Sequence, residues 1–538
     1  ILLKLIELNG LENSLNILNG MFAFFLLNQK KKEIFIVRDK FGQKPLYYKV
    51  EQNFFAFASE LKAFKKHPFI KFELDPVSVN YFINYSYISA PRTIFKNIHQ
   101  LEPGSYLRLS YENLKLFSKN KKNEQKSIIH YVKWWSPKKK IKKNYESKNT
   151  INNYLDVLRS SIKEMLVSDV PTGTFLSGGI DSSLITSICS EVSEKKIDTF
   201  TVGFSDFLYD ESQKSKLISN HLNTNHHEIF LENKDILEIS ENLTYIYDEP
   251  FADSSQIPSI YLSRFAKSKI TVALTGDGGD ELFGGYNRYF YLPRLIKIFK
   301  VVNPKIIKIL IELYLKFPKI LKNFVNYFIE KKNITQFEDK LIKLSKVLQS
   351  ANINESLYLE TIKTNNSDFF KNPHNSIPGN SYNYEDANDL MYLDKVNYLP
   401  NDILCKVDRA TMYSSLESRA PFLSNQIVDY VDGLDTKLLI KNTQGKLINK
   451  TALSNYLPMK LFFAPKQGFG VPLNAWLKGP LLPWAKDLFN NHNFSENYNI
   501  DNYHVKKIWT NFLQSGKGDE KLVWNLLILK SWDERWNV

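Results

Sequence analysis

The segment SGGIDSS at 177–183 has the residue types that could bind the phosphates of a nucleotide. It directly follows the apolar run 173–176. Its small residues let backbone N–H groups approach an anion closely, and a helix beginning near Ser182 would add its positive end. Asp181 is best explained as a ligand of Mg²⁺, which prefers oxygen ligands and phosphate partners. The alternative is a simple turn into a helix that binds nothing.

A second glycine-rich segment, TGDGGDELFGGY at 275–286, could supply a further metal ligand. It places Asp277, Asp280 and Glu281 among several glycines after another apolar run. Like charges so close together are costly unless a cation or hydrogen bonds offset them. Asp280 is therefore the second candidate metal ligand. A solvated acidic loop is the alternative, but it does not account for the density of glycine.

Both segments are expected at the ends of parallel strands. From residue 151 onward, amphipathic stretches of helical length alternate with short apolar runs. This alternation is typical of an α/β fold with a doubly wound parallel sheet, whose ligands bind beyond the carboxyl ends of the strands. The expected strands are 173–176, 198–204, 227–231 and 270–275, and the expected helices include 210–222 and 256–267.

The chain divides by composition into three predicted parts. Residues 1–130 contain short apolar and aromatic runs separated by turn residues, which predicts a β-rich domain. Residues 131–149 are rich in Lys, Asn, Glu and Ser and are predicted to be a linker, anchored by Trp134 and Trp135. Residues 150–538 contain the predicted sheet, followed from about residue 290 by mostly helical sequence.

The overall composition narrows the classes of function. The 538 residues carry a net charge of +14, but the lysines are scattered, so we expect no nucleic-acid partner. Lysines also interrupt the most apolar stretch, 291–329, and we expect no membrane span. Two cysteines, Cys189 and Cys405, are too few to staple the chain, which is typical of a reducing compartment and predicts a cytoplasmic protein.

Six motifs in one order resemble the bacterial glutamine-hydrolysing asparagine synthetases. SGGIDSS is similar to the pyrophosphate-binding loop of the ATP pyrophosphatases. The other five are DEPFADSS (248–255), LTGDGGDELFGGY (274–286), YLPNDILCKVDRATM (398–412), ESRAPFL (417–423) and PKQGFGVPLNAWL (465–477). The resemblance runs from about Asn19 to Trp532 and implies an ATP-pyrophosphatase sheet domain with extra helices.

The resemblance implies a reaction and the residues that carry it out. The β-carboxylate of aspartate attacks the α-phosphorus of ATP, giving β-aspartyl-AMP and pyrophosphate, and ammonia then displaces AMP to leave asparagine. Mg²⁺ is expected to bridge Asp181 and Asp280, and catalytic roles are implied for Lys466 and Asp277, although Lys466 could be an ordinary surface lysine. The residues implied in ATP binding are Leu176, Ser177, Gly178, Gly179, Asp181, Ser182, Val202, Thr275 and Gly276.

The motifs at 398–412 and 417–423 place many charges beside apolar residues. The charged residues are Asp402, Lys406, Asp408, Arg409 and Arg419. They are interpreted as a partly buried network lining the path of aspartate and ammonia, and salt bridges that only dock two helices are the alternative. The family usually has Asp after PFL where this chain has Ser424, which keeps a helix cap possible but removes a carboxylate.

Residues 1–130 resemble part of the family's glutaminase domain, an α+β fold of the N-terminal-nucleophile class. The matching segments are 19–26, 38–48 and 57–64. In that fold the nucleophile is a Cys at the mature N-terminus, which this sequence does not contain, and Cys189 falls in the other domain. We therefore expect a partial glutaminase domain and a chain that uses only free ammonia.

Two other functions remain open at this stage. The same chemistry could amidate another carboxylate, such as a sugar acid of a surface polysaccharide. A non-catalytic partner or RNA-binding protein is the alternative from another class. The expected small-molecule partners are ATP, aspartate, and ammonia or glutamine, and a homodimer is possible.

Overall fold

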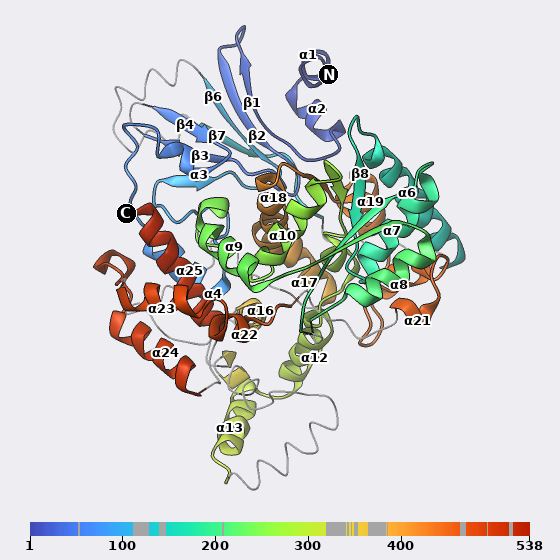
Figure 1. Cartoon of the computed structure of the whole chain (residues 1–538). Coiled ribbons are helices and arrows are strands. Elements are labelled where there is room, and N and C mark those ends of the chain that lie inside the picture. Colours follow the sequence, from blue (N-terminus) through green and yellow to red (C-terminus); the bar gives the residue numbers. More distant parts are fainter. Residues whose placement is uncertain are drawn as a thin grey trace.

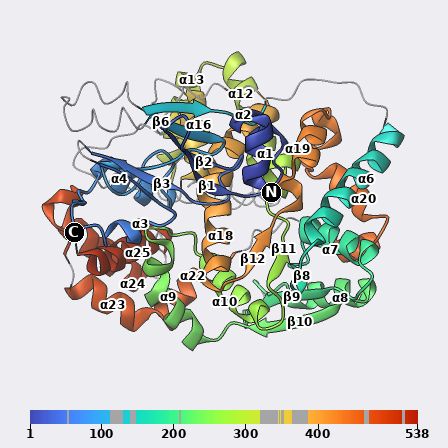
Figure 2. The same ribbon diagram turned by 90° about the horizontal axis from the view of Figure 1, so that it is seen from above.

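The computed structural model describes most of the chain. The described residues are 1–51, 54–110, 129–138, 147–206, 209–318, 341, 344–345, 347–348, 353–363, 384, 386–462, 470–491, 493–515 and 520–537. Within them, no helix combines the length and the apolar character that crossing a lipid bilayer requires. The ribbon is shown in two orientations (Figure 1 and Figure 2).

A five-stranded, all-parallel sheet forms the centre of the larger part of the chain. Its strands lie in the order β10-β9-β8-β11-β12, so that the first strand in the sequence, β8, occupies the middle. Their bounds are Thr172–Phe175 (β8), Asp198–Gly203 (β9), Asn225–Phe230 (β10), Val272–Leu274 (β11) and Glu417–Arg419 (β12). The predicted mixed α/β architecture is confirmed, whereas the three-residue edge strand β12 had not been predicted.

Apolar side chains of the sheet alternate between two cores. Val272 and Leu274 of β11 belong to one core, and Ala273 between them belongs to the other, as the two-residue period of a strand requires. The first core contains buried residues of α6 (Ser147–Leu166), α7 (Ile180–Val192) and α8 (Ser212–Leu222). The second contains those of α9 (Asn233–Tyr247) and α10 (Gln256–Lys267), which cover the opposite face (Figure 1).

The N-terminal part contains two antiparallel sheets. One has the order β1-β2-β6-β7 and the other β4-β3-β5. The strands are β1 (Ala23–Asn28), β2 (Glu33–Arg38), β3 (Tyr47–Val50), β4 (Phe55–Ala58), β5 (Ile98–Gln100), β6 (Ser105–Ser110) and β7 (Ile129–Lys133). The helices are α1 (Leu2–Asn9), α2 (Leu11–Ile17), α3 (Leu61–Phe64) and α4 (Pro76–Tyr85).

Strand β7 corrects the predicted start of the linker. Residues 131–133 of the predicted linker 131–149 pair with β6 and extend the first sheet. The polar composition of the surrounding segment had concealed this short strand. The backbone N–H groups of Trp134 and Trp135 both donate to the Gly104 carbonyl oxygen, at 2.9 and 3.1 Å, and their rings pack on Phe22 and Phe41, with centroids 6.3 and 4.8 Å apart. Residues 139–146 lie outside the described part.

The described residues after β11 are largely helical, as predicted. The α-helices are α11 (Gly279–Phe283), α12 (Arg288–Val301), α13 (Pro304–Leu315), α16 (Ile353–Ile362), α17 (Ala387–Leu393), α18 (Leu404–Tyr413), α19 (Asn425–Asp432), α20 (Leu447–Leu453), α21 (Met459–Phe462), α22 (Leu473–Lys478), α23 (Leu482–Asn491), α24 (Asn502–Ser515) and α25 (Glu520–Trp536). A π-helical stretch, Asp394–Ile403, leads directly into α18. Ser424 caps α19 by accepting from the Ile427 N–H at 3.5 Å, as its position had suggested.

The last helix, α25, packs against the N-terminal part of the chain. Helix α25 packs against α4, and its Asn525 side-chain amide donates to the Ile83 carbonyl oxygen at 2.9 Å. The Trp532 ring N–H donates to the Asp248 carbonyl oxygen at 2.6 Å. Both views place α25 beside α3 and α4 (Figure 1 and Figure 2). Buried apolar residues of the two parts, such as Phe82 and Trp532, also belong to one core. The N-terminal sheets are held against the larger part by this core.

Candidate active site

The two glycine-rich turns lie side by side where the strand order reverses. The first follows β8 and the second follows β11, and these strands are neighbours although they are far apart in sequence. A Cβ atom at Gly276 would lie 3.0 Å from Asp181 Cβ, and one at Gly279 would lie 2.5 Å from Asp181 Cγ. Glycine is thus required for the second turn to approach the Asp181 side chain. A strand-order reversal is also the usual ligand-binding position of an open parallel sheet.

The first turn is closed by its own serines. Gly178 adopts a left-handed φ of 70°, and Gly179 precedes the first residue of α7. The Ser182 hydroxyl lies 3.0 Å from the Ser177 hydroxyl and accepts a hydrogen bond from the Ser177 N–H at 3.2 Å. These contacts hold the turn at the positive end of a thirteen-residue helix, α7, where an anionic phosphate would be stabilised.

The residues implied in nucleoside binding surround the strand ends. Leu176 and Val202 are buried. The Leu176 N–H donates to the Phe200 carbonyl oxygen at 3.0 Å, and the Thr275 N–H donates to the Arg419 carbonyl oxygen at 2.9 Å. Both N–H groups are therefore already used within the sheet. Nucleoside contacts of these residues stay a prediction.

Asp181 and Asp280, the two predicted metal ligands, meet around one cation. That cation is the ammonium group of Lys446, which contacts Asp280 Oδ1 at 2.6 Å and also donates to Asp181 Oδ2. Burial raises the pKa of Asp181, Lys446 opposes this effect, and Asp280 adds to it. Burial lowers the pKa of Lys446, but the two carboxylates outweigh it, and the net shift is upward, so the lysine stays charged.

This arrangement is compatible with Mg²⁺ bound together with ATP. A single nitrogen that reaches both carboxylates demonstrates that they converge on one cation-sized space. In the described part of the chain, no group of three or more His, Cys, Asp or Glu residues could hold a metal by itself. Mg²⁺ is commonly held by one or two carboxylates together with substrate phosphates. The donor set therefore fits a metal that arrives with a nucleotide.

Sequence reasoning missed Lys446 and its neighbour Asn449. The Asn449 side-chain amide donates to Asp181 Oδ1 at 3.1 Å, and its own oxygen accepts from the Tyr154 hydroxyl at 2.7 Å. Helix α20, which contains Asn449, packs against α7. These residues follow Asp181 by more than 260 positions. No local spacing links them to the glycine-rich turns, and only their tertiary position reveals them.

The other acidic residues of the second turn have separate partners. Asp277 Oδ2 accepts from the Thr275 hydroxyl at 2.7 Å. Burial raises the pKa of Asp277, with Lys406 opposing and Asp181 and Asp280 reinforcing the shift. Glu281 instead accepts from the Tyr286 hydroxyl at 2.6 Å. Asp277 therefore interacts electrostatically with both the metal-ligand pair and Lys406.

Lys406 is the centre of a second, largely buried charge cluster. Its ammonium group donates to Asp253 Oδ2 at 2.8 Å and to the Ser255 hydroxyl at 2.9 Å. Burial and then the Asp253 carboxylate raise the pKa of Asp402 to about 8, while Lys406 opposes the shift. Asp402 therefore holds its proton more tightly than an ordinary carboxyl group, because Asp253 is the carboxylate paired with Lys406. Asp402 and Lys406 thus lie together with Asp253, and their role in binding substrate stays a prediction.

Two further residues of the predicted substrate pocket contact the N-terminal part instead. Asp408 accepts from the Lys44 ammonium group at 2.6 Å. The Arg409 guanidinium donates to Glu60 at 2.9 Å. These ion pairs join α18 to the N-terminal sheets. Their side chains serve the contact between the two parts, and a role in binding substrate stays a prediction.

Arg419 and Lys466 are the remaining predicted site residues. The Arg419 guanidinium donates to the carbonyl oxygens of Met165 and Val167, at 2.6 and 2.9 Å, near the end of α6. Its side chain therefore lies away from the Lys406 cluster, although its carbonyl oxygen supports Thr275. Lys466 lies outside the described residues, and its catalytic role stays a prediction.

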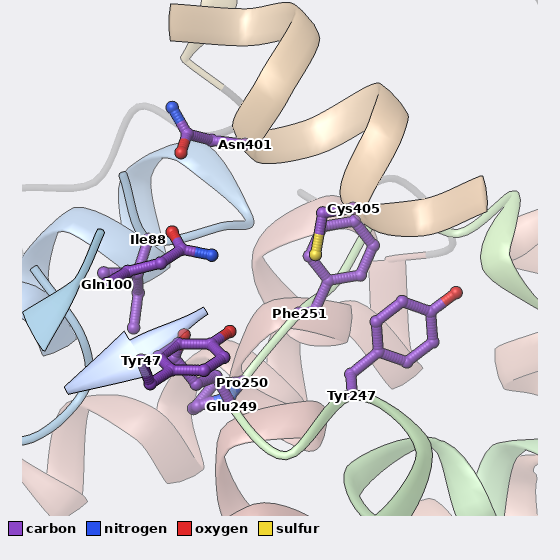
Figure 3. A pocket seen from close by; sticks show the side chains of 9 residues that line it. All are labelled: Tyr47, Ile88, Gln100, Tyr247, Glu249, Pro250, Phe251, Asn401 and Cys405. Atoms are coloured by element: carbon purple, nitrogen blue, oxygen red, sulfur yellow. The ribbon is translucent and has the colours of Figure 1, made fainter. Parts of the chain in front are cut away.

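A small cavity lies between the N-terminal sheets and the larger part (Figure 3). It encloses about 20 Å³ of space accessible to a water-sized molecule, and about 10–15 Å³ is enough for one. Its lining residues are Tyr47, Ile88, Gln100, Tyr247, Glu249, Pro250, Phe251, Asn401 and Cys405. Glu249 accepts from the Ile94 N–H at 2.7 Å, and burial raises its pKa to about 8.

The two buried carboxyl groups predict how stability changes with pH. Asp402 and Glu249 have a pKa of about 8 when folded, compared with about 4 when unfolded. Between these values the folded state binds more protons, so the free energy of unfolding should fall as the pH rises from about 5 to about 8. Replacing Glu249 by Gln should make this fall shallower. Urea unfolding of the unchanged protein and of Glu249→Gln at pH 6 and pH 8 measures the free energy of unfolding. An equal fall between the two pH values in both proteins would contradict the prediction.

The chain matches two family models along its length. The model described as Asparagine synthase matches residues 153–534. The model described as Glutamine amidotransferase domain matches residues 1–120. The first match includes the parallel sheet, both glycine-rich turns and Lys446.

Similar curated proteins carry the corresponding name. The chain is 27% identical to glutamine-hydrolyzing asparagine synthetase 1 of Bacillus subtilis over 522 residues, which cover 97% of this chain and 78% of that protein. It is 35% identical to putative glutamine-hydrolyzing asparagine synthetase 2 of Methanocaldococcus jannaschii over 297 residues, 54% of this chain and 55% of that protein. A putative glutamine-hydrolyzing asparagine synthetase of Mycobacterium bovis is 26% identical over 474 residues, 87% of this chain and 69% of that protein.

A solved structure of NMN synthetase from Francisella tularensis covers 27% of this chain and 60% of that chain at 14% identity, with a TM-score of 0.20. That score is too low to support a conclusion about the fold. The match over residues 153–534 covers more than half of the chain and includes the whole candidate active site. The chain belongs to the asparagine synthase family.

Proposed function

We propose that this chain makes asparagine from aspartate, ATP and ammonia. The observation that carries the proposal is the convergence of Asp181 and Asp280 on one cation, at the ends of the two central strands. Family membership supports the use of ATP and the ligase activity. The matched amidotransferase segment supports glutamine as the usual source of ammonia in the family.

The geometry suggests how the chain would hold ATP. The pyrophosphate part would lie over the first turn, where Gly178 and Gly179 leave the backbone open and α7 presents its positive end. Asp181 and Asp280 would hold Mg²⁺. When bound, the metal would neutralise the negative charge that develops on the departing pyrophosphate. Lys466 would add a second positive charge on the transferring groups.

Aspartate would bind beside Asp277 and the charge cluster around Lys406. Its β-carboxylate oxygen would form a bond to the α-phosphorus while the bond from that phosphorus to the pyrophosphate oxygen breaks. Ammonia would then attack the acyl carbon, lose a proton and release AMP. Asp277 interacts electrostatically with both the metal-ligand pair and Lys406, which supports a role in forming the acyl-phosphate intermediate. Lys406, with Asp253 and Asp402, would fix the charged groups of aspartate.

The arrangement also supports finer proposals on architecture. We infer that the sheet is of the ATP-pyrophosphatase type, because the first turn follows its central strand. Residues 1–130 would form the partial glutaminase domain and residues 150–538 the synthetase domain. The cavity between the two parts is large enough for ammonia, which is about the size of water, and would form part of its path.

An initial-rate assay tests the proposal. We expect pyrophosphate and AMP to appear in equal amounts from Mg–ATP only when aspartate and ammonium are both present in turnover assays. Glutamate and a uronic acid serve as alternative acceptors. Turnover with the uronic acid but not with aspartate, in protein whose fold is verified by circular dichroism, would replace the proposal by amidation of a sugar acid.

A further inference from the structure

Lys446 occupies the space between the two predicted metal ligands. Its ammonium group lies 2.6 Å from Asp280 Oδ1 and also bonds Asp181 Oδ2. The residue is 8% exposed. Two carboxylates held this close, with side chains only 13% and 25% exposed, require a positive charge near them. In the free protein, Lys446 supplies that charge.

The backbone of Lys446 is fixed to the second glycine-rich turn. Its N–H donates to the Phe283 carbonyl oxygen at 2.9 Å. The preceding Gly445 lies so close to Gly284 that a Cβ atom would be 1.9 Å from the Gly284 carbonyl oxygen. The start of the Lys446 side chain is therefore held in place, and its ammonium group is carried on a flexible four-carbon stem.

A bridging metal and the Lys446 ammonium group cannot bind the same carboxylate oxygens at once. A metal between Asp181 and Asp280 would need the oxygens that now accept from Lys446. Displaced from them, the ammonium group would stay near the first turn because its backbone is fixed. A lysine is a suitable point charge for a phosphate oxygen. With the metal on the two carboxylates and Lys446 on a phosphate oxygen, each of these charges would still have a partner of opposite sign.

We propose that Lys446 is the resident counter-ion of the metal site, which Mg²⁺ arriving with ATP displaces and which then binds the nucleotide's phosphates. The inference rests on the proposed function only for the identity of the nucleotide. It explains how two partly buried acidic ligands can stay close together without a metal. It also predicts that metal binding in the absence of nucleotide is weak, because the lysine competes for the ligands.

Titration with Mn²⁺ alone, followed by electron paramagnetic resonance of the free ion, tests the exchange. Lys446→Gln removes the competing charge and should bind Mn²⁺ at least about tenfold more tightly than the unchanged protein, which corresponds to about 1.4 kcal/mol. Lys441→Gln is the matched control, since Lys441 is an exposed lysine in the segment that leads to Lys446. The control should bind Mn²⁺ like the unchanged protein.

Thermal unfolding covers the case in which Lys446→Gln folds poorly. Without metal this variant should melt at a lower temperature than the unchanged protein, and Mn²⁺ should raise its Tm by more than it raises that of the unchanged protein. Equal Mn²⁺ affinities together with equal Tm shifts would overturn the proposal. Neither measurement uses aspartate. The Mn²⁺ results therefore test the role of Lys446 even if aspartate-dependent turnover is not found.

Discussion

Replacing Asp181 by Asn is expected to lower the rate of aspartate-dependent pyrophosphate release by at least about a hundredfold. The substitution keeps the shape of the side chain but removes one of the two charges that converge on the cation. The Mg²⁺ concentration needed for half-maximal rate should rise as well. Steady-state rates over a range of Mg²⁺ concentrations at saturating ATP measure both effects.

The control for this experiment is Asp156→Asn on α6. Asp156 is exposed and pairs with Arg159 at 3.0 Å, away from the glycine-rich turns. Its replacement should leave the rate within about twofold, since an exposed ion pair contributes little. Near-normal turnover of Asp181→Asn at ordinary Mg²⁺ concentrations would mean that Asp181 is not a metal ligand.

Replacing Lys406 by Met is expected to destabilise the folded protein by about 3–5 kcal/mol. The ammonium group is the positive charge that faces Asp253 at 2.8 Å, and it also opposes the raised pKa values of Asp402 and Asp277. Without it, the largely buried Asp253 carboxylate has lost its cation. Chemical unfolding at pH 8 measures the loss, which should shrink at lower pH as Asp253 takes up a proton.

A double-mutant cycle separates the charge effect from lost packing. Asp253→Asn combined with Lys406→Met removes both charges and should recover a large part of the stability that the single Lys406→Met change loses. Lys216→Met is the control, because Lys216 forms an exposed pair with Glu228 at 3.3 Å and should cost less than about 1 kcal/mol. Additive losses in the double variant would show that the Lys406–Asp253 pair is not coupled.

The central strands and both glycine-rich turns could be predicted from the sequence. The reason is physical: a buried strand must be a short apolar run, and a backbone that approaches Asp181 closely must be glycine at 276 and 279. Alternation of these runs with amphipathic helices then indicates a parallel sheet. Strand β12 escaped prediction because three residues, Glu417–Arg419, are too few to display a period.

Partners that lie far apart in sequence could not be predicted. Lys446 reaches Asp181 across 265 positions, and nothing in its own neighbourhood distinguishes it from the many other lysines. Charge alone also left Asp408 and Arg409 ambiguous, since substrate ligands and docking ion pairs have the same composition. Their contacts with Lys44 and Glu60 depend on how the N-terminal sheets dock, which is a tertiary property.

A heavy-oxygen label in the β-carboxylate of aspartate tests the central claim most directly. If that carboxylate attacks the α-phosphorus and ammonia later displaces AMP, one labelled oxygen stays with the AMP. Mass spectrometry of the products formed from Mg–ATP, labelled aspartate and ammonium should therefore find one heavy atom in each AMP and none in pyrophosphate. Label in inorganic phosphate, with ADP in place of AMP, would mean that the γ-phosphorus is attacked and would contradict the account.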